Sequence, residues 1–220
     1  HRVDRRQRQM CIRDRYSGDG SSMMEFFKPN DEVCGKLAVF KSPEEVVNMA
    51  HLALGSNFCS EDPNEMQAVL DLMLEQKKCV KVYSSEGIND RLKSGEVIMH
   101  AHWDGYSQVG KWEYMDDLTY AYPKEGVVGW FDSLVMPKGA KNVKEAKAFM
   151  NFLMNPENMA ILSNNAAYAN AIPESQKYLS DKMKNATNIQ VPDGVPVVFG
   201  QACNEKAQSF VACALALSVP

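Results

Sequence analysis

The sequence lacks the features that mark several large protein classes. No apolar run approaches the ~18 residues that a helix needs to cross a bilayer, so the sequence predicts no membrane-spanning helix. The motifs GxSxG, GxxxxGK(S/T), GxGxxG and HExxH are all absent, which leaves no nucleophile elbow, phosphate-binding loop, dinucleotide-binding turn or paired zinc-binding histidines. A hydrolase or a nucleotide-dependent enzyme therefore has no positive support in these residues.

The N-terminal segment is basic but lacks the apolar stretch of a secretory signal. At face value it is an arm for nucleic acid, but its string RQRQMCIRDR resembles translated sequencing-adapter DNA. We therefore expect residues 1–22 to be a non-native head, and the true start of the gene, with any signal peptide, to lie upstream.

The charge of the chain is unevenly distributed. Residues 1–15 contain six Arg and two Asp, a net charge of +4, whereas the whole chain carries −4, which leaves −8 for residues 16–220. An acidic body argues against a nucleic-acid partner and favours a cationic ligand.

The six cysteines are dispersed and include no CxxC pair, so they form no zinc framework. Cys11 lies in the suspect head, and Cys213 lies in an apolar tail, residues 211–220, that we suspect is non-native too. The other four can pair in an oxidising compartment, for example Cys59 with Cys79 and Cys34 with Cys203. Buried free thiols are the alternative, and the sequence leaves the pairing open.

Several helix starts can be predicted from capping residues in the sequence. Four capping residues predict helices that begin after Ser42, Asp62, Asn142 and Asn155. Proline directly follows three of them, and Asn142 has Glu145 three residues later. Ser42 with Glu45 reads as a capping box, and Gly55 is a natural stop for that helix. In the third helix we expect a buried face made by Ala146, Phe149, Met150 and Leu153.

Short apolar segments between these helices predict strands at 36–40, 97–103, 118–122 and 130–136. Helices that alternate with short apolar strands are typical of α/β layering. The composition, 45% hydrophobic and 24% charged over 220 residues, is that of one large globular domain or two small ones.

The strand expected at 130–136 carries the most informative pair of side chains. Period-two alternation places Trp130 and Asp132 on one face of it. An aromatic ring beside a carboxylate suits a ligand that is both apolar and cationic, because the ring face attracts the cation and the carboxylate neutralises it. The pair favours a binding site for a small organic cation.

Three further side chains occupy places where a cleft can form. Trp103 ends an expected strand before an Asp-Gly turn, Tyr168 follows a helix end, and Glu45 lies in the first turn of a helix. Each also has a purely structural interpretation: the tryptophan can be a core residue, Glu45 a capping glutamate, and Tyr168 a packing residue against the preceding helix.

His100 and His102 lie two apart in an expected strand, so their rings face one side and can seed a metal site. No third ligand stands at a diagnostic spacing, and we favour partly buried strand histidines. A metal-dependent enzyme that uses this pair is the alternative from another functional class.

Four segments together resemble the substrate-binding proteins of bacterial ABC transporters for spermidine and putrescine. They are GKLAVFKSPEEVVNMAHLALG, SSEGINDRLKSGEVIMHAHWDG, YPKEGVVGWFDSLVMPKGAKNVKEAKAFMNFLMNPE and NNAAYANAIPES. The third is the most specific, because its turn, its aromatic-x-Asp pair and its helix follow in the family's order and spacing.

The resemblance implies an α/β fold of the type II periplasmic-binding-protein kind, with two lobes joined at a hinge. Residues 23–122 would form the second lobe, residues 123–168 would return to the first lobe, and residues 169–220 would cross back to the second lobe and end in the suspect tail. About the first third of a full-length relative would be missing, so we expect the returning elements to expose a face meant for absent partners.

The resemblance also implies a cation box made by Trp103, Trp130, Asp132, Tyr168 and Glu45. The protein would be a periplasmic monomer without a cofactor, would catalyse no reaction, and would deliver its ligand to an ABC permease in the membrane.

Two positions depart from the family's patterns. The spermidine-type pattern has Asp where Ser42 stands, and the putrescine-type pattern has Asp where Tyr106 stands. A related binding protein for another small organic amine is therefore the alternative within this class.

Overall fold

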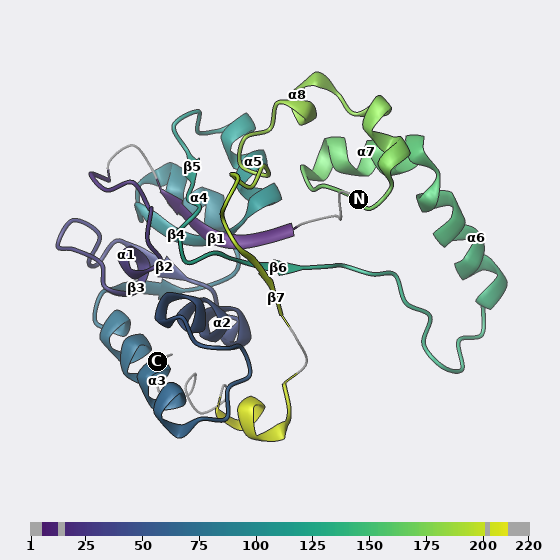
Figure 1. Cartoon of the computed structure of the whole chain (residues 1–220). Helices are drawn as coiled ribbons and strands as arrows, with labels where there is room; N and C mark the ends of the chain where they lie inside the picture. Colours follow the sequence, from purple (N-terminus) through teal and green to yellow (C-terminus); the bar gives the residue numbers. More distant parts are fainter. Residues whose placement is uncertain (1–5, 13–15, 201–202, 211–220) are drawn as a thin grey trace.

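A mixed sheet of seven strands runs through the residues that the computed structural model describes, which are 6–12, 16–200 and 203–210. Its order is β3-β2-β4-β1-β6-β7, and β5 pairs with β1 outside this path (Figure 1). The strands are β1 (Arg6–Ile12), β2 (Leu37–Val39), β3 (Val80–Tyr83), β4 (Met99–Trp103), β5 (Thr119–Tyr120), β6 (Val127–Trp130) and β7 (Val197–Phe199). The strands predicted at 36–40, 97–103 and 118–122 are confirmed.

One strand runs against the others at the centre of the sheet. β1 is antiparallel to β4 and to β6, whereas β2 pairs in parallel with β3 and β4, and β6 in parallel with β7. β1 belongs to the segment 1–22 that we expect to be non-native. Ladder hydrogen bonds join backbone groups of any sequence, so this pairing does not test that expectation. The rest of the suspect head, residues 1–5 and 13–15, and the tail 211–220 with Cys213 lie outside the described residues.

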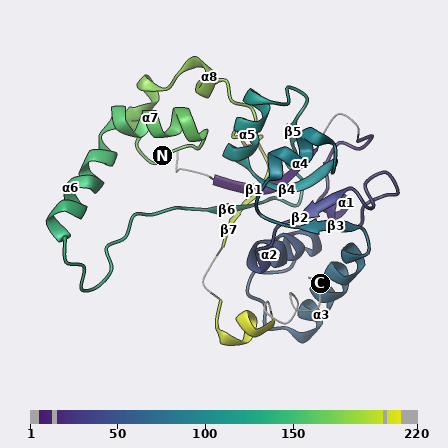
Figure 2. The same cartoon turned by 180° about the vertical axis from the view of Figure 1, so that it is seen from behind.

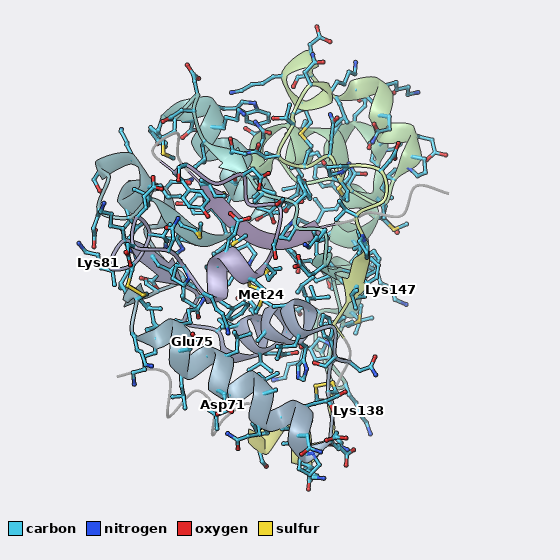
Figure 3. The ribbon with its side chains drawn as sticks, turned by 60° about the vertical axis from the view of Figure 1, so that its left-hand side comes forward. Met24, Asp71, Glu75, Lys81, Lys138 and Lys147 are labelled. Carbon is cyan, nitrogen blue, oxygen red and sulfur yellow. A yellow bond between two sulfur atoms is a disulfide. The ribbon has the colours of Figure 1, made fainter. Side chains whose placement is uncertain are left out.

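Helices cover both faces of the sheet. α1 (Met24–Phe27), α2 (Pro43–Leu54) and α3 (Pro63–Lys77) pack on one side, and α4 (Ile88–Ser94) and α5 (Asp104–Glu113) on the other (Figure 1 and Figure 2). Figure 3 labels Asp71 and Glu75, exposed side chains of the outer helix α3. Most of the largest fully buried side chains come from the strands and from these helices, among them Met10, Phe26, Phe27, Leu37, Met49, Ile88, Leu92 and Met99.

The predicted helix starts are confirmed, but only two of the four capping side chains make their bond. Asp62 Oδ1 accepts from Asn64 N–H at 2.7 Å, and Asn155 Oδ1 accepts from Glu157 N–H at 2.9 Å. Ser42 and Asn142 make no such hydrogen bond, so the predicted capping box of α2 is wrong. Pro43 and the left-handed Gly55 (φ 68°) suffice to mark the ends of α2.

The strand predicted at 130–136 is wrong beyond its first residue. β6 ends at Trp130, and residues 131–136 leave the sheet as an extended connection to α6 (Val143–Met154). Alternation along an apolar segment indicates a strand only if another strand lies beside it, and none of the described residues pairs with 131–136.

The helices after this connection form an arm beside the sheet. They are α6, α7 (Pro156–Ala166), a 3-10 helix (Pro173–Tyr178) and α8 (Asp181–Lys184), and α6 stands farthest from the sheet in both cartoons (Figure 1 and Figure 2). α6 buries no side chain, so the buried face predicted for it is wrong, and Phe149 is 57% exposed. Large exposed apolar side chains gather along this arm and its connection: Phe131, Leu134, Val135, Phe149, Phe152, Met154, Ile161 and Leu162. The elements after β6 therefore expose an apolar face, as expected.

Two disulfides join cysteines in the described part of the chain, and both differ from the example pairing given above. Cys34 bonds to Cys79, and Cys59 bonds to Cys203. Cys34 and Cys79 closely precede the adjacent parallel strands β2 and β3, so the sheet itself brings their backbones together. Among the described cysteines, Cys11 is a buried free thiol.

We expect the exposed face of α6 to contribute little to folding. Phe149→Ala should change the free energy of unfolding by less than about 0.5 kcal/mol, because it removes few buried contacts. Phe27→Ala, the matched control in the core, should lower it by about 3–5 kcal/mol. Urea unfolding of both variants measures this difference, and a large loss for Phe149→Ala would show that α6 is buried in solution.

Candidate functional site

The carboxyl ends of three parallel strands meet at one edge of the sheet. β2 leads there into the start of α2, and β4 and β6 end there at Trp103 and Trp130. Trp103 lies opposite Arg8 of β1, and Trp130 lies opposite Arg6. Because positions 6 and 8 are two apart on β1, the two tryptophan positions lie on the same face of the sheet. The carboxyl edge is where open α/β sheets form their binding crevices.

A carboxylate and an indole are joined at this edge. Trp103 Nε1–H donates to Glu45 Oε1 at 3.2 Å, and the Trp103 ring stacks on Phe40 with centroids 4.8 Å apart. Glu45 is only 5% exposed and lies in the first turn of α2, where the helix dipole stabilises a negative charge. The pair thus presents an aromatic ring beside a carboxylate held by two different elements.

The other two aromatic residues of the predicted box also meet. The rings of Trp130 and Tyr168 pack edge to face, with centroids 6.5 Å apart. Tyr168 follows α7 and lies directly against Gly105, where a Cβ would come within 2.6 Å of the ring. Gly105 is two residues after Trp103, so the backbone at the start of α5 connects the Trp103–Glu45 pair to the Tyr168–Trp130 pair.

Asp132 is placed differently from the expectation. It lies two residues beyond the end of β6, is exposed, and does not share a strand face with Trp130. The predicted alternation is wrong here because the strand ends first. Its role in ligand binding stays a prediction.

Three residues of this region were not selected by sequence reasoning. Phe40 stacks on Trp103, Gly105 leaves room for Tyr168, and Asp104 is fully buried, with Oδ1 accepting from Gly105 N–H at 2.8 Å. Burial, with the Asp104 charge adding to it, raises the pKa of Tyr120 well above its usual value. The sequence offered two signals: the aromatic Phe40 directly after β2, and the Asp-Gly pair after Trp103, which was predicted to be a turn although α5 begins there.

Ser42 and Tyr106, the two positions that depart from the family patterns, lie in different environments. Ser42 precedes α2 without capping it, and Tyr106 packs its ring on His102, with centroids 5.2 Å apart. Position 106, which is Asp in the putrescine-type pattern, thus holds an aromatic ring that packs on the buried His102.

His100 and His102 are both fully buried in β4, with ring centroids 6.5 Å apart. Burial lowers the pKa of His100 to about 3 and that of His102 well below its usual value. His100 Nδ1 lies 2.7 Å from the carbonyl oxygen of Ala101, and His102 Nε2 lies 2.8 Å from Asn89 Oδ1. Across residues 6–12, 16–200 and 203–210, no group of three His, Cys, Asp or Glu side chains is arranged to hold a metal ion.

Comparison with known families places this chain among solute-binding proteins. The family described as bacterial extracellular solute-binding protein matches residues 9–191. The putrescine-binding periplasmic protein PotF of Escherichia coli (strain K12) is 29% identical over 178 residues, which cover 74% of this chain and 45% of PotF. The chain spans about half the length of the curated relatives that it matches.

Solved structures show the same fold at low identity. The spermidine/putrescine ABC transporter substrate-binding protein PotD from Streptococcus pneumoniae, in complex with calcium and HEPES, superposes with a TM-score of 0.81 at 18% identity, covering 97% of this chain and 66% of PotD. MotA from A. tumefaciens B6, in complex with glucopine, gives 0.73 at 21% identity, with 98% and 68% covered. These likenesses confirm the predicted α/β fold of the type II periplasmic-binding-protein kind. The lobe boundaries 23–122, 123–168 and 169–220 stay predictions. None of the helices in the described part of the chain has the length and apolarity to cross a bilayer.

We expect Gly105→Ala to displace Tyr168. The new Cβ would overlap the ring, so the free energy of unfolding should fall by about 1–3 kcal/mol. In a Tyr168→Ala background the same substitution should cost less than about 0.5 kcal/mol, because the ring is gone. Urea unfolding of the four proteins of this double-mutant cycle measures the coupling, and additive losses would contradict the contact.

We expect acid to destabilise the fold through its buried histidines. The folded pKa of His100 and of His102 lies below the unfolded value of about 6.5, so below that pH the unfolded chain binds protons that the folded chain does not. The free energy of unfolding should therefore fall as the pH drops from 6.5 towards 3, by about 2 kcal/mol at pH 5 through His100, and His102 should act in the same direction.

The measurement is urea unfolding between pH 7 and pH 5 for the unsubstituted chain and for His100→Gln. Between pH 7 and pH 5, the free energy of unfolding should fall less in His100→Gln, because the unfolded variant has one histidine fewer to protonate. Equal pH dependence in both proteins would show that His100 titrates normally in the folded state.

Proposed function

The chain belongs to the family of bacterial extracellular solute-binding proteins, and on this premise we propose that it captures a polyamine, putrescine or spermidine, for import by an ABC transporter. PotF, a putrescine-binding protein, and the spermidine/putrescine-binding relatives support the ligand class, and PotD, a substrate-binding protein of an ABC transporter, supports the transport role. Because the chain spans about half the length of the curated relatives, the ligand and the partner are proposals for the whole protein.

The observation that carries the proposal is the Glu45–Trp103 pair at the same sheet edge as Trp130 and Tyr168. Polyamines are methylene chains with an ammonium at each end. Aromatic faces would pack on the methylenes and attract the ammonium, while carboxylates would neutralise it. In this arrangement Glu45 serves one end of the ligand, and Asp132, on the connection that leaves β6, serves the other.

Capture would proceed without a chemical reaction. Two lobes would close on the cation by a hinge motion, which removes water from the ammonium groups, and the closed form would dock on a membrane permease. The protein would act outside the cytoplasm as a monomer. The −8 charge of residues 16–220 would favour the approach of a cation.

A second candidate is a binding protein for another small organic amine. Ser42 and Tyr106 stand where the two polyamine patterns have a carboxylate, and an ammonium buried without a partner costs several kcal/mol. A ligand with fewer charges needs fewer carboxylates. Tyr106, packed on His102, is the observation that favours this candidate.

The test is an NMR titration that follows the indole N–H signals of the three tryptophans. Putrescine, added at constant ionic strength, should shift the signals of Trp103 and Trp130. Trp112, whose ring lies under Lys182 at 4.4 Å, should not move and serves as the internal control. For this chain, which presents only part of the relatives' length, we expect a Kd of about 1 mM, or about −4 kcal/mol.

Matched ligands decide between the candidates. 1,4-Butanediol has the carbon chain of putrescine without its charges and should shift none of the signals. A monoamine or a quaternary ammonium compound that binds more tightly than putrescine would favour the second candidate. Failure of all amines to move Trp103 and Trp130 would refute both candidates, and micromolar binding would refute the expectation that this chain binds poorly.

The role of Asp132 has its own test. Asp132→Asn should weaken putrescine binding about tenfold, and more than Trp103→Ala or Trp130→Ala, because it leaves an ammonium unpaired. Asp71→Asn, on the exposed side of α3, is the matched control for the loss of one negative charge (Figure 3). Normal binding by Asp132→Asn would rule out its place in the box.

A further inference from the structure

A buried polar relay lies directly beneath Trp103. The N–H of Trp103 donates to His102 Nδ1 at 2.9 Å, His102 Nε2 lies 2.8 Å from Asn89 Oδ1, and Asn89 Nδ2–H donates to the carbonyl oxygen of Tyr106 at 3.0 Å. His102 is fully buried, and Asn89 is 3% exposed. The relay therefore connects the end of β4, the start of α4 and the first turn of α5 through direct bonds.

The hydrogen bonds of the relay fix the proton on His102. The Trp103 N–H can only donate, so Nδ1 must accept and carries no proton. The proton of the neutral ring is then on Nε2 and is donated to Asn89 Oδ1. The amide of Asn89 is oriented by the same logic, because its nitrogen faces the Tyr106 carbonyl. Every bond in the chain has one donor and one acceptor, so only one arrangement satisfies all three.

Packing leaves the relay no room to rearrange. A Cβ at Gly110 of α5 would come within 2.4 Å of Asn89 Oδ1, so that helix lies directly on the amide. The Tyr106 ring closes the other side by packing edge to face on the imidazole.

We propose that His102 and Asn89 are positioning residues that hold the Trp103 backbone in the place where its indole reaches Glu45. The positioning role itself does not depend on the proposed function. Only its effect on ligand binding rests on that proposal. The bond from Trp103 N–H fixes the peptide from which the indole projects, and the bond to the Tyr106 carbonyl fixes the start of α5, where Gly105 receives Tyr168. One pair of buried side chains thus sets the geometry of both the Trp103–Glu45 contact and the Trp130–Tyr168 contact.

Two substitutions of His102 separate the two ends of the imidazole. His102→Asn keeps an acceptor near the position of Nδ1 but loses the group at Nε2. His102→Gln keeps a donor near Nε2 but loses the acceptor for the Trp103 N–H. His100→Gln is the matched control, since His100 is equally buried two residues earlier on the same strand and its Nδ1 bonds to its neighbouring carbonyl.

The readout is hydrogen exchange of the full chain, measured as the protection of the Trp103 amide relative to the Ala101 amide, so that a global loss of stability cancels. His102→Gln should lower this ratio about tenfold, whereas His102→Asn should keep it within about threefold and His100→Gln within about twofold. The indole N–H of Trp103 should lose protection in His102→Gln in parallel. If His102→Gln fails to fold, Asn89→Ala tests the relay from its other end and should lower the same ratio at least about threefold.

An unchanged Trp103 ratio in His102→Gln, or in Asn89→Ala, would overturn the proposal. So would a fall in amide protection that leaves the indole unaffected, because the relay would then hold the backbone without positioning the ring. A putrescine titration of the same proteins separates this result from the proposed function. If His102→Gln changes the indole but putrescine binds to neither protein, the positioning role stands and the polyamine proposal fails.

Discussion

Backbone pairing along β1 holds the two parts of the sheet together. On one side β1 bonds to β4, which continues through β2 to β3, and on the other side it bonds to β6, which continues to β7. β1 is the strand that lies between β4 and β6, so it determines how the ends of these two strands are placed relative to each other. The register of β1 is also what places Trp103 and Trp130 on one face. Because ladder bonds depend on the backbone and not on the side chains, the frame is compatible with either origin of residues 1–22.

Several polar side chains of the site region are buried within the fold. Glu45, Asp104 and His102 are all nearly or fully inaccessible, and each has a hydrogen-bond partner within the chain. His102 has a partner at each ring nitrogen, so any other arrangement of this ring would leave a buried donor or acceptor unpaired. Helix α6 contrasts with this region, because it buries no side chain.

The fold class and most element positions could be predicted because they depend on local rules. Proline at the first helical position and glycine at the stop fixed the ends of α2, and apolar segments located β2, β4 and β5. Predictions that required a partner in space were less secure. The strand at 130–136 and the buried face of α6 were inferred from their patterns, but residues 131–136 pair with no described strand, and α6 buries no side chain although it contacts α7.

By itself the sequence determined the α/β layering, the family resemblance and four residues that the structure brings into two contacts, Glu45 with Trp103 and Trp130 with Tyr168. Only the tertiary structure decided the rest, because it depends on which segments become neighbours. The pairing of Cys34 with Cys79 follows from the adjacency of β2 and β3. The His102–Asn89 relay joins three elements that no spacing in the sequence connects. The exposed place of Asp132 follows from where β6 loses its neighbours, which is a property of the assembled sheet.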